Sequence, residues 1–311
     1  MEKQAKIYIA GHEGMLGSAI RRIFGEGGYS DIIVKNSGEL DLSDSAAVAE
    51  FFKKEKPDYV FMAASKSGSI QANIKYPAEF IYENLVIQNN IIHNAYLSGV
   101  KKLLFFGASC VYPKDSPQPI KEEYFLTGEL EPTSRPYAVA KIAGIEMCRA
   151  YNKQYGTKFI PVVPATPYGP NDHFDLEKSH VLSALIRKFH EAKMNGDKEI
   201  TLWGSGLPAR EFIYIDDLAE ACIFIMNTAD DRDLINIGAG TDIAIKELAE
   251  KIKAIAGFQG EIKWDVSKPD GAMKKLLDTN RLRSLGWSHK IDLDEGIKRT
   301  YQWFVGNFNR L

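Results

Sequence analysis

The sequence predicts an α/β fold: a doubly wound parallel sheet with a smaller C-terminal lobe. A short apolar strand, residues 7–9, is followed by glycines at three-residue spacing and then by a helical apolar pattern. Strand-like apolar segments then alternate with amphipathic helices to residue 163, as in parallel sheets covered by helices. The alternation loosens after about residue 164. We therefore expect one domain over residues 1–165 and a lobe over 166–311, partly interleaved with it.

Within the first domain, apolar periodicity and chain-breaking residues define the elements in order. Ser43 is expected to cap a helix, Pro57 to end it, and the prolines at 113, 117 and 119 to exclude regular structure from a loop. The pattern predicts strands over 31–35, 59–63, 102–106 and 159–163, and helices over 14–28, 43–54, 77–98 and 136–155.

The second part shows a less regular succession, without an internal repeat or a low-complexity linker. It predicts helices over 181–194, 217–228, 245–256 and 292–304, and short strands over 199–203, 212–215, 234–237 and 261–264. We expect this lobe to close over the carboxyl edge of the sheet, where ligands bind in such folds.

Three glycines after the first strand predict a dinucleotide site. Gly11 permits a tight turn, Gly14 lets the backbone approach a pyrophosphate, and Gly17 lets the helix pack closely on the sheet. The helix N-terminus then faces the phosphates, with Met15 and Leu16 in its first turn. The strand before and the helix after provide the context that such a glycine pattern requires.

Composition narrows the function classes. The net charge of −2 is not typical of a nucleic-acid-binding or membrane-surface protein, and no apolar run approaches the length that spans a bilayer. The three cysteines stand far apart, without a metal-type Cys/His cluster, so we expect no metal and free thiols in a cytoplasmic protein. The N-terminal residues enter a strand at once, which leaves no room for a signal peptide.

A catalytic pair is predicted in the helix that follows Pro136. Tyr137 and Lys141 are four residues apart and therefore share one helix face. A neighbouring lysine is expected to lower the pKa of the phenol, which could then exchange a proton with a substrate alcohol or carbonyl. The position of this pair after the fourth strand of a dinucleotide fold favours the catalytic interpretation.

Together with the glycines and the Tyr137–Lys141 pair, the segment GASCVYP at 107–113 resembles the extended short-chain dehydrogenase/reductases, which have a Rossmann fold. More narrowly, the chain resembles the GDP-L-fucose synthase family, the GDP-4-keto-6-deoxymannose 3,5-epimerase-4-reductases. The resemblance runs from residue 6 to about 304. It is carried by IAGHEGMLGSAIRR, AEFIYENLVIQNNIIH, KLLFFGASCVYP, PYAVAKIAGIEMC, SHVLSALIRKFHEAK, LWGSGLPAREFIYIDDLA and KPDGAMKKLLD.

This resemblance implies an NADPH-dependent enzyme that epimerises C3 and C5 of a GDP-linked 4-keto sugar and then reduces C4. It assigns the epimerising proton transfers to Cys110 and His180, whose ordinary pKa values lie on either side of neutral. Without it, Cys110 would be interpreted as a small buried apolar residue and His180 as a helix-start or surface residue. Tyr137 would protonate the C4 oxygen, Lys141 would hold the nicotinamide ribose, and Ser109 belongs to the same segment.

The resemblance also implies the binding residues. For the cofactor they are Gly11, Gly14, Met15, Leu16, Gly17, Lys35, Asp41, Leu42, Ala63, Ala64, Lys66, Lys141, Pro164, Thr166 and His180. For the GDP-sugar they are Ser67, Ser69, Asn171, Val181, Lys188, Trp203, Arg210, Asp270 and Lys275. Lysine and arginine suit a diphosphate, whereas Trp203 could stack on the base or simply pack in the core.

Several residues depart from the family pattern. Ala108 stands where the family has a serine or threonine whose hydroxyl helps to hold the carbonyl oxygen. Ser67 and Ser69 replace valine and glycine, and either could supply the missing hydroxyl. Thr166 replaces an asparagine, and Asn171 and His173 are exchanged relative to the family order. These changes leave a GDP-linked heptose or another modified 4-keto sugar as an open alternative.

The cofactor preference and the reaction also leave alternatives. Glu13 and Ser37 replace basic residues of the family, yet no acidic residue ends the second strand, so we expect NADP(H), with NAD(H) as the alternative. A reductase or epimerase alone, and a non-enzymatic nucleotide sensor, remain possible functions, whereas a dehydratase is disfavoured by Ser109 and Cys110 in place of an acidic pair. Apolar residues on helices 81–96 and 136–155, including Val86, Ile91, Ile142 and Met147, predict a homodimer.

Overall fold

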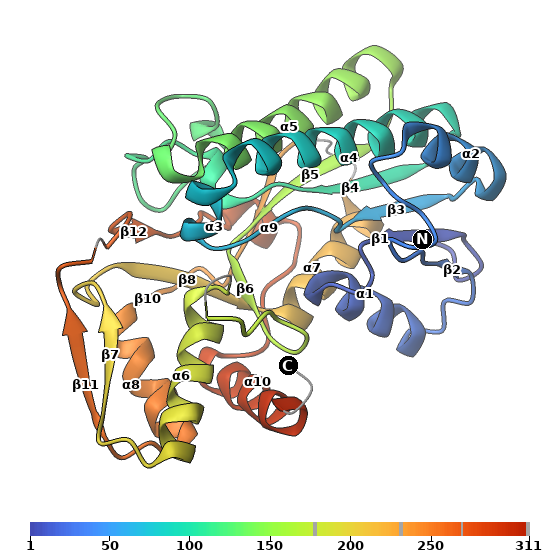
Figure 1. Ribbon diagram of the computed structural model, residues 1–311. Helices are drawn as coiled ribbons and strands as arrows, with labels where there is room; N and C mark the ends of the chain where they lie inside the picture. Colours follow the sequence, from blue (N-terminus) through green and yellow to red (C-terminus); the bar gives the residue numbers. More distant parts are fainter. Residues whose placement is uncertain (177–178, 230–232, 269, 309–311) are drawn as a thin grey trace.

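A parallel sheet of six strands forms the centre of the protein (Figure 1). The computed structural model describes residues 1–176, 179–229, 233–268 and 270–308. The strands lie in the order β2–β1–β3–β4–β5–β9. Their bounds are β1 (Ile7–Ala10), β2 (Ile32–Ile33), β3 (Tyr59–Met62), β4 (Lys102–Phe106), β5 (Phe159–Pro164) and β9 (Ile235–Ile237). Because all five pairings are parallel, the carboxyl ends of the strands meet at one edge.

Helices cover both faces of this sheet, as expected for a doubly wound fold (Figure 1). On one face the two longest helices pack side by side next to a third, and on the other face the first helix packs against one from the second half of the chain. These helices are α4 (Pro77–Leu97), α5 (Arg135–Tyr155) and α2 (Ser45–Glu55), then α1 (Met15–Glu26) and α7 (Ile215–Thr228).

The second lobe combines small sheets with three helices (Figure 1). Strand β8 (Ala209–Tyr214) pairs with β6 (Thr166–Tyr168), β10 (Asp242–Ala244) and β12 (Lys274–Lys275), while β7 (Glu199–Trp203) pairs with β11 (Glu261–Asp265). The helices are α6 (Val181–Asn195), α8 (Ile245–Ala256) and α10 (Leu293–Asn307).

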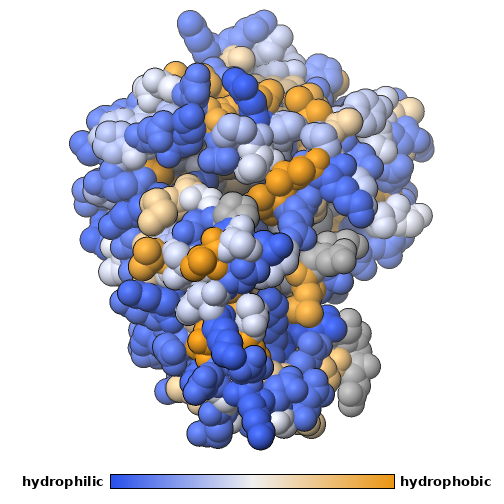
Figure 2. Space-filling model, turned by 60° about the vertical axis from the view of Figure 1, so that its left-hand side comes forward, coloured by the Kyte–Doolittle hydropathy of each residue, from blue (hydrophilic) through white to orange (hydrophobic). Residues whose placement is uncertain are grey.

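Two hydrophobic cores correspond to the two parts. The first surrounds the six-stranded sheet and includes Phe61 and Leu104, together with Cys222 of α7 and Ile235 of β9. The second lies among α6, α8 and α10 and includes Phe189. Residues of α7 and β9 therefore return from the second half of the chain to complete the first core. On the face shown in Figure 2, apolar residues gather in separate patches on a largely hydrophilic surface.

Most predicted elements are present, with bounds that differ by a few residues. The predicted cap is wrong: Asp44, not Ser43, begins α2 by accepting hydrogen bonds from the backbone N–H groups of Ala46 and Ala47. The predicted strand over 31–35 is reduced to Ile32–Ile33. Short elements that the pattern did not predict are α3 (Ile70–Lys75), α9 (Asn280–Ser284), β6, β10, β12, and the 3₁₀ turns η1 (Ser109–Val111), η2 (Glu122–Tyr124) and η3 (Pro132–Ser134).

The apolar residues predicted to form an exposed interface are less exposed than expected. Ile91 is fully buried in the first core, so its inclusion is wrong, while Val86, Ile142 and Met147 are half-buried. Among the described residues, no helix is long and apolar enough to cross a membrane. The described residues also contain no group of three or more His, Cys, Asp or Glu side chains placed to hold a metal ion.

Candidate active site

The turn between β1 and α1 has the close backbone contacts that the glycine spacing predicts. Gly11 has a φ of +83°, and a Cβ added there would lie 2.6 Å from the backbone nitrogen of Ala64. A Cβ on Gly17 would lie 2.1 Å from the carbonyl oxygen of Gly11. Gly14 differs, because its Cβ position is 3.5 Å from that same oxygen and otherwise open. The cradle therefore excludes side chains at 11 and 17 and leaves space at 14.

The N-terminus of α1 is suited to an anion. Gly14 precedes the helix in an extended conformation, and no side chain caps it. The first backbone N–H groups of the helix are therefore available to a phosphate, and the helix dipole favours negative charge there. The residues present fit the pyrophosphate of a dinucleotide.

Tyr137, Lys141 and Cys110 lie together at the carboxyl edge of the sheet. The Lys141 ammonium is 5.7 Å from the centroid of the Tyr137 ring and donates a hydrogen bond of 2.9 Å to the carbonyl oxygen of Phe106, the last residue of β4. Cys110 sits in η1, just beyond that strand, and interacts electrostatically with both residues. The turn of α5 that follows Pro136 places the tyrosine and the lysine on the face that covers η1.

Burial controls the ionisation of this cluster. It raises the pKa of Tyr137, with a smaller contribution from Cys110, so the expected lowering of this pKa by Lys141 is wrong as a net direction. Burial also lowers the pKa of Lys141 to about 8. The pKa of the Cys110 thiol is raised by burial, an effect that Lys275 and then Lys141 oppose. Tyr137 therefore holds its proton at neutral pH and is suited to act as an acid.

His180 is the residue that precedes α6, in an extended conformation. It interacts electrostatically with Asp172. Burial raises the pKa of Asp172, and a hydrogen bond from the Ser183 hydroxyl opposes part of this rise. A carboxyl group that interacts with the histidine can orient its ring. No hydrogen bond or ion pair among the described residues joins His180 to Cys110, so their pairing across a substrate stays a prediction.

Three of the predicted sugar-nucleotide residues meet at the junction of the two lobes. Lys275 of β12 pairs in register with Arg210 of β8. Burial is the largest effect that lowers the pKa of Lys275 and of Arg210. Asp270 accepts a hydrogen bond of 2.7 Å from the hydroxyl of Ser205 and interacts with Arg210. Two half-buried cations near one edge of the sheet are suited to hold a diphosphate.

The other predicted substrate residues are more dispersed. Burial lowers the pKa of Lys188 on α6, whereas Trp203 is 56% exposed, with the Lys268 ammonium 5.4 Å from its ring centroid. Asn171 donates a hydrogen bond to Ser18 of α1, beside the dinucleotide turn. Val181 is the first residue of α6.

Ser67 and Ser69 do not have the positions that a second hydroxyl at the carbonyl requires. Ser67 is exposed, and the Ser69 hydroxyl accepts a hydrogen bond of 3.1 Å from Ala72 as the cap of α3. Ser65, which the sequence patterns did not single out, has a side-chain interaction with Tyr137 that lowers the pKa of the phenol. No local sequence pattern marks this residue, because the interaction joins the loop after β3 to α5.

The predicted cofactor residues surround the turn, and several already have protein partners. Lys66 forms ion pairs with Glu79 and Glu83, and Lys35 contacts Glu39 at 3.4 Å. Asp41 accepts a hydrogen bond of 2.7 Å from the Ser43 hydroxyl. The rest lie on or just beyond strands at the carboxyl edge, on α1, or in the loop before α2: Met15, Leu16, Leu42, Ala63, Ala64, Pro164 and Thr166.

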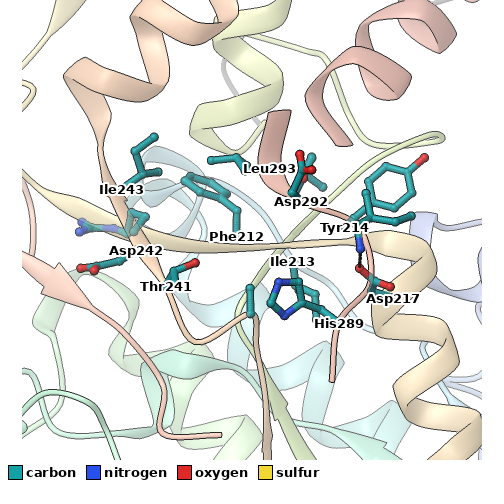
Figure 3. Close-up of a pocket in the computed structure, with 14 residues that line it drawn as sticks. Phe212, Ile213, Tyr214, Asp217, Thr241, Asp242, Ile243, His289, Asp292 and Leu293 are labelled. Atoms are coloured by element: carbon teal, nitrogen blue, oxygen red, sulfur yellow. Dashed lines mark hydrogen bonds between the residues drawn. The ribbon is translucent and has the colours of Figure 1, made fainter. Parts of the chain in front are cut away.

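A separate cavity of ≈ 240 Å³ lies in the second lobe (Figure 3). The rings of Phe212 and Tyr214, from β8, and the side chains of Thr241, His289 and Asp292 line it. Tyr137, Cys110 and Lys275 are not among its lining residues. Arg210, one of the predicted diphosphate residues, does line it, so the cavity adjoins the sugar-nucleotide residues rather than the Tyr137 cluster.

Comparisons with known proteins agree with this geometry. The model of the NAD dependent epimerase/dehydratase family matches residues 7–238. GDP-L-fucose synthase 1 of Arabidopsis thaliana is 52% identical over 306 residues, which cover 98% of this chain and 95% of that protein.

Solved structures give the same result. A GDP-6-OMe-4-keto-L-xylo-heptose reductase from Campylobacter jejuni has a TM-score of 0.92 and 43% identity, with 99% of both chains covered. A GDP-L-fucose synthetase from Naegleria fowleri bound to NADP has a TM-score of 0.92 and 28% identity, covering 99% of this chain and 96% of that one. The similarity thus extends over nearly the full length of the chain.

Proposed function

The chain belongs to the NAD dependent epimerase/dehydratase family and within it to the GDP-L-fucose synthases, and from this premise we propose that it converts a GDP-4-keto-6-deoxy sugar by 3,5-epimerisation and C4 reduction. The observation that carries the proposal is the cluster of Tyr137, Lys141 and Cys110 at the same carboxyl edge of the sheet as the glycine turn. Tyr137 can donate a proton to a ketone, the Cys110 thiol can act as an acid or base, and the glycine turn can bind a dinucleotide.

In the epimerisation, the C4 ketone acidifies the protons on C3 and C5. Cys110 and His180 exchange these protons from opposite faces of the sugar ring, one removing a proton and the other returning it. The electrostatic interactions of Cys110 with Lys275 and Lys141 favour its thiolate against the effect of burial. Asp172, which interacts electrostatically with His180, is placed to orient the histidine ring.

In the reduction, Tyr137 donates its proton to the C4 oxygen. NADPH, when bound, supplies the hydride that C4 receives. Gly14 and the N-terminus of α1 hold the pyrophosphate, and Lys141 holds the nicotinamide ribose. Arg210 and Lys275 bind the diphosphate of the GDP-sugar at the junction of the lobes.

One experiment tests both reactions. The protein is incubated with GDP-4-keto-6-deoxymannose in deuterated water, with and without NADPH. We expect deuterium at C3 and C5 without NADPH, and loss of NADPH absorbance with it. Neither event in the presence of folded protein would contradict the proposal, whereas NADPH loss without exchange would indicate a reductase alone.

A second candidate function is C4 reduction of a GDP-linked heptose. It is favoured by the heptose reductase that matches this chain at 43% identity over 99% of its length. A GDP-4-keto-heptose offered in parallel separates the two, because the preferred sugar gives the higher kcat/KM.

The assembly and location are part of the proposal. We infer a homodimer formed through α4 and α5, where Tyr82 and Leu97 expose more than half of their surface. We place the enzyme in the cytoplasm, since its three cysteines are free and buried.

A further inference from the structure

The register of the central sheet brings Ser65 level with Ala108. Strands β3 and β4 lie side by side (Figure 1) and pair in parallel, and their last matched pair is Met62 with Phe105. Ser65 and Ala108 each follow by three residues, at the carboxyl edge of the sheet. Ala108 is extended, with φ −153° and ψ 152°, so its chain continues in the direction of β4. At this level of the sheet, Ser65 therefore carries a hydroxyl group and Ala108 carries a methyl group.

Ser65 contacts the proton donor of the reaction. Its side chain interacts with the phenol of Tyr137 and favours the deprotonated form of that phenol. The Tyr137 ring is held from another side by Phe80, at 6.0 Å and 88° between ring planes. Lys141 directs its ammonium to the carbonyl oxygen of Phe106 instead. The hydroxyl that supports the Tyr137 oxygen thus comes from the loop after β3.

The chemistry of Tyr137 explains what this hydroxyl can do. A phenol has one proton to give, and it leaves a phenolate in a buried position when the C4 oxygen accepts that proton. A donor fixed on the phenolic oxygen stabilises this charge and leaves the Tyr137 proton free for the substrate. An alanine at position 108 can supply no such bond.

We propose that Ser65 is the positioning residue of the reducing centre: its hydroxyl orients the Tyr137 proton toward the C4 oxygen and stabilises the phenolate that remains. This inference rests on the proposed function, since it assumes that Tyr137 protonates a ketone. It assigns to the loop after β3 a role that residue 108 cannot fill.

The test measures single-turnover NADPH oxidation in the Ser65→Ala variant and in the double variant Ser65→Ala/Ala108→Ser, which moves the hydroxyl group from position 65 to position 108. Loss of one preorganised donor costs about 10²-fold in rate. We expect a loss of this order in Ser65→Ala and recovery of at least tenfold in the double variant. In the pH profile, the limb that reports deprotonation of Tyr137 should move to higher pH in Ser65→Ala, which a purely structural defect would not cause.

Two controls make the result decisive. Ser98→Ala removes a hydroxyl that bonds to Asn94 at the far end of α4, and it should leave the rate unchanged. Deuterium exchange at C3 and C5 should persist in Ser65→Ala, which also verifies folding together with NADPH binding. A folded Ser65→Ala enzyme with the wild-type rate and pH profile would overturn the inference, whereas a wild-type enzyme that oxidises no NADPH would overturn the proposed function.

Discussion

Individual residues at the sheet edge separate the two half-reactions. We predict that Cys110→Ser and His180→Asn lose the incorporation of solvent deuterium at C3 and C5, because each removes one of the two groups that exchange protons there. Tyr137→Phe should retain exchange and lose NADPH oxidation, because it removes the donor to the C4 oxygen. Mass spectrometry of the sugar and absorbance of NADPH measure the two effects.

Cofactor binding serves as the control for these three variants, and titration of NADPH fluorescence should give wild-type affinity in each. Undiminished exchange in both Cys110→Ser and His180→Asn would show that other groups move the protons.

Lys141 carries a second prediction at this scale. Burial lowers its pKa to about 8 from 10.5, so the folded state binds fewer protons than the unfolded state between these values. Lys141 therefore destabilises the apo protein most below pH 8, and this cost disappears above pH 10.5. The pKa shift corresponds to a cost of roughly 3 kcal/mol in the free energy of unfolding. A variant without the lysine avoids this cost but also loses the hydrogen bond to Phe106, which is worth about 1–2 kcal/mol.

We accordingly expect Lys141→Met to raise the free energy of unfolding of the apo protein by about 1 kcal/mol at pH 7 while abolishing reduction. The gain should shrink as pH rises from 8 to 10.5. Urea denaturation at several pH values measures it, with the exposed Lys298 changed to Met as the control for loss of a charge. A Lys141→Met variant that is less stable than wild type at pH 7 would contradict this account.

For single residues, sequence patterns predict which side chains share a helix face better than they predict how deeply those side chains are buried. The spacing of Tyr137 and Lys141 placed both side chains on one helix face, and the structure has them there. It could not predict the pKa of Tyr137, because that pKa depends on burial by segments distant in the sequence. Ser65 was missed for a similar reason, since its contact crosses from the loop after β3 to α5.

Among the elements, the turn before α1 gives contrasting predictions for its glycines. Gly14→Ala should fold normally and bind NADPH more weakly, because its Cβ occupies open space above the helix N-terminus. Gly17→Ala should destabilise the protein severely, because its Cβ would lie 2.1 Å from the Gly11 carbonyl oxygen. Urea denaturation and NADPH titration measure the two effects independently.

Gly25→Ala is the matched control within the same helix. Its Cβ meets nothing within 4 Å, and alanine restricts the unfolded chain, so we expect unchanged binding and about 0.5–1 kcal/mol of added stability. Equal loss of binding in Gly25→Ala and Gly14→Ala would show that α1 is sensitive to any substitution rather than to the cradle.

Long elements were predictable and short ones were not. Strand β4 and helix α8 match their predicted ranges, since each has a buried apolar pattern of sufficient length. Strand β12 has two residues, both lysine, and exists because it pairs with β8. Helix α2 begins at Asp44 rather than Ser43 because either side chain can cap, and the local geometry selects one.

The whole molecule depends on chain segments that return to the first core. Cys222 of α7 and Ile235 of β9 are fully buried around the six-stranded sheet, although they follow several elements of the second lobe. The lobe is thereby connected to the sheet at more than one place, and Lys275, which pairs with Arg210, lies near Cys110. Alternation of strands and helices predicted the sheet, but the path of a returning chain has no local pattern.

The last prediction concerns two copies of the chain. Helices α4 and α5 pack side by side on one face of the sheet, and they expose Tyr82 by 68% and Val139 by 39%. If these side chains meet a second copy, Tyr82→Glu/Val139→Glu buries charge without a partner and should convert a dimer to a monomer. Light scattering after gel filtration at micromolar concentration measures the mass.

Met194 on α6 provides the matched control, because it is 70% exposed on the second lobe. Met194→Glu should remain dimeric. Since Phe80 of α4 contacts Tyr137, separation of the copies would loosen the helix that holds the proton donor, and we expect the monomeric variant to reduce more slowly at unchanged NADPH affinity. A monomeric wild type would contradict the predicted dimer. A dimer that is lost only in Met194→Glu would show that the interface lies on the second lobe.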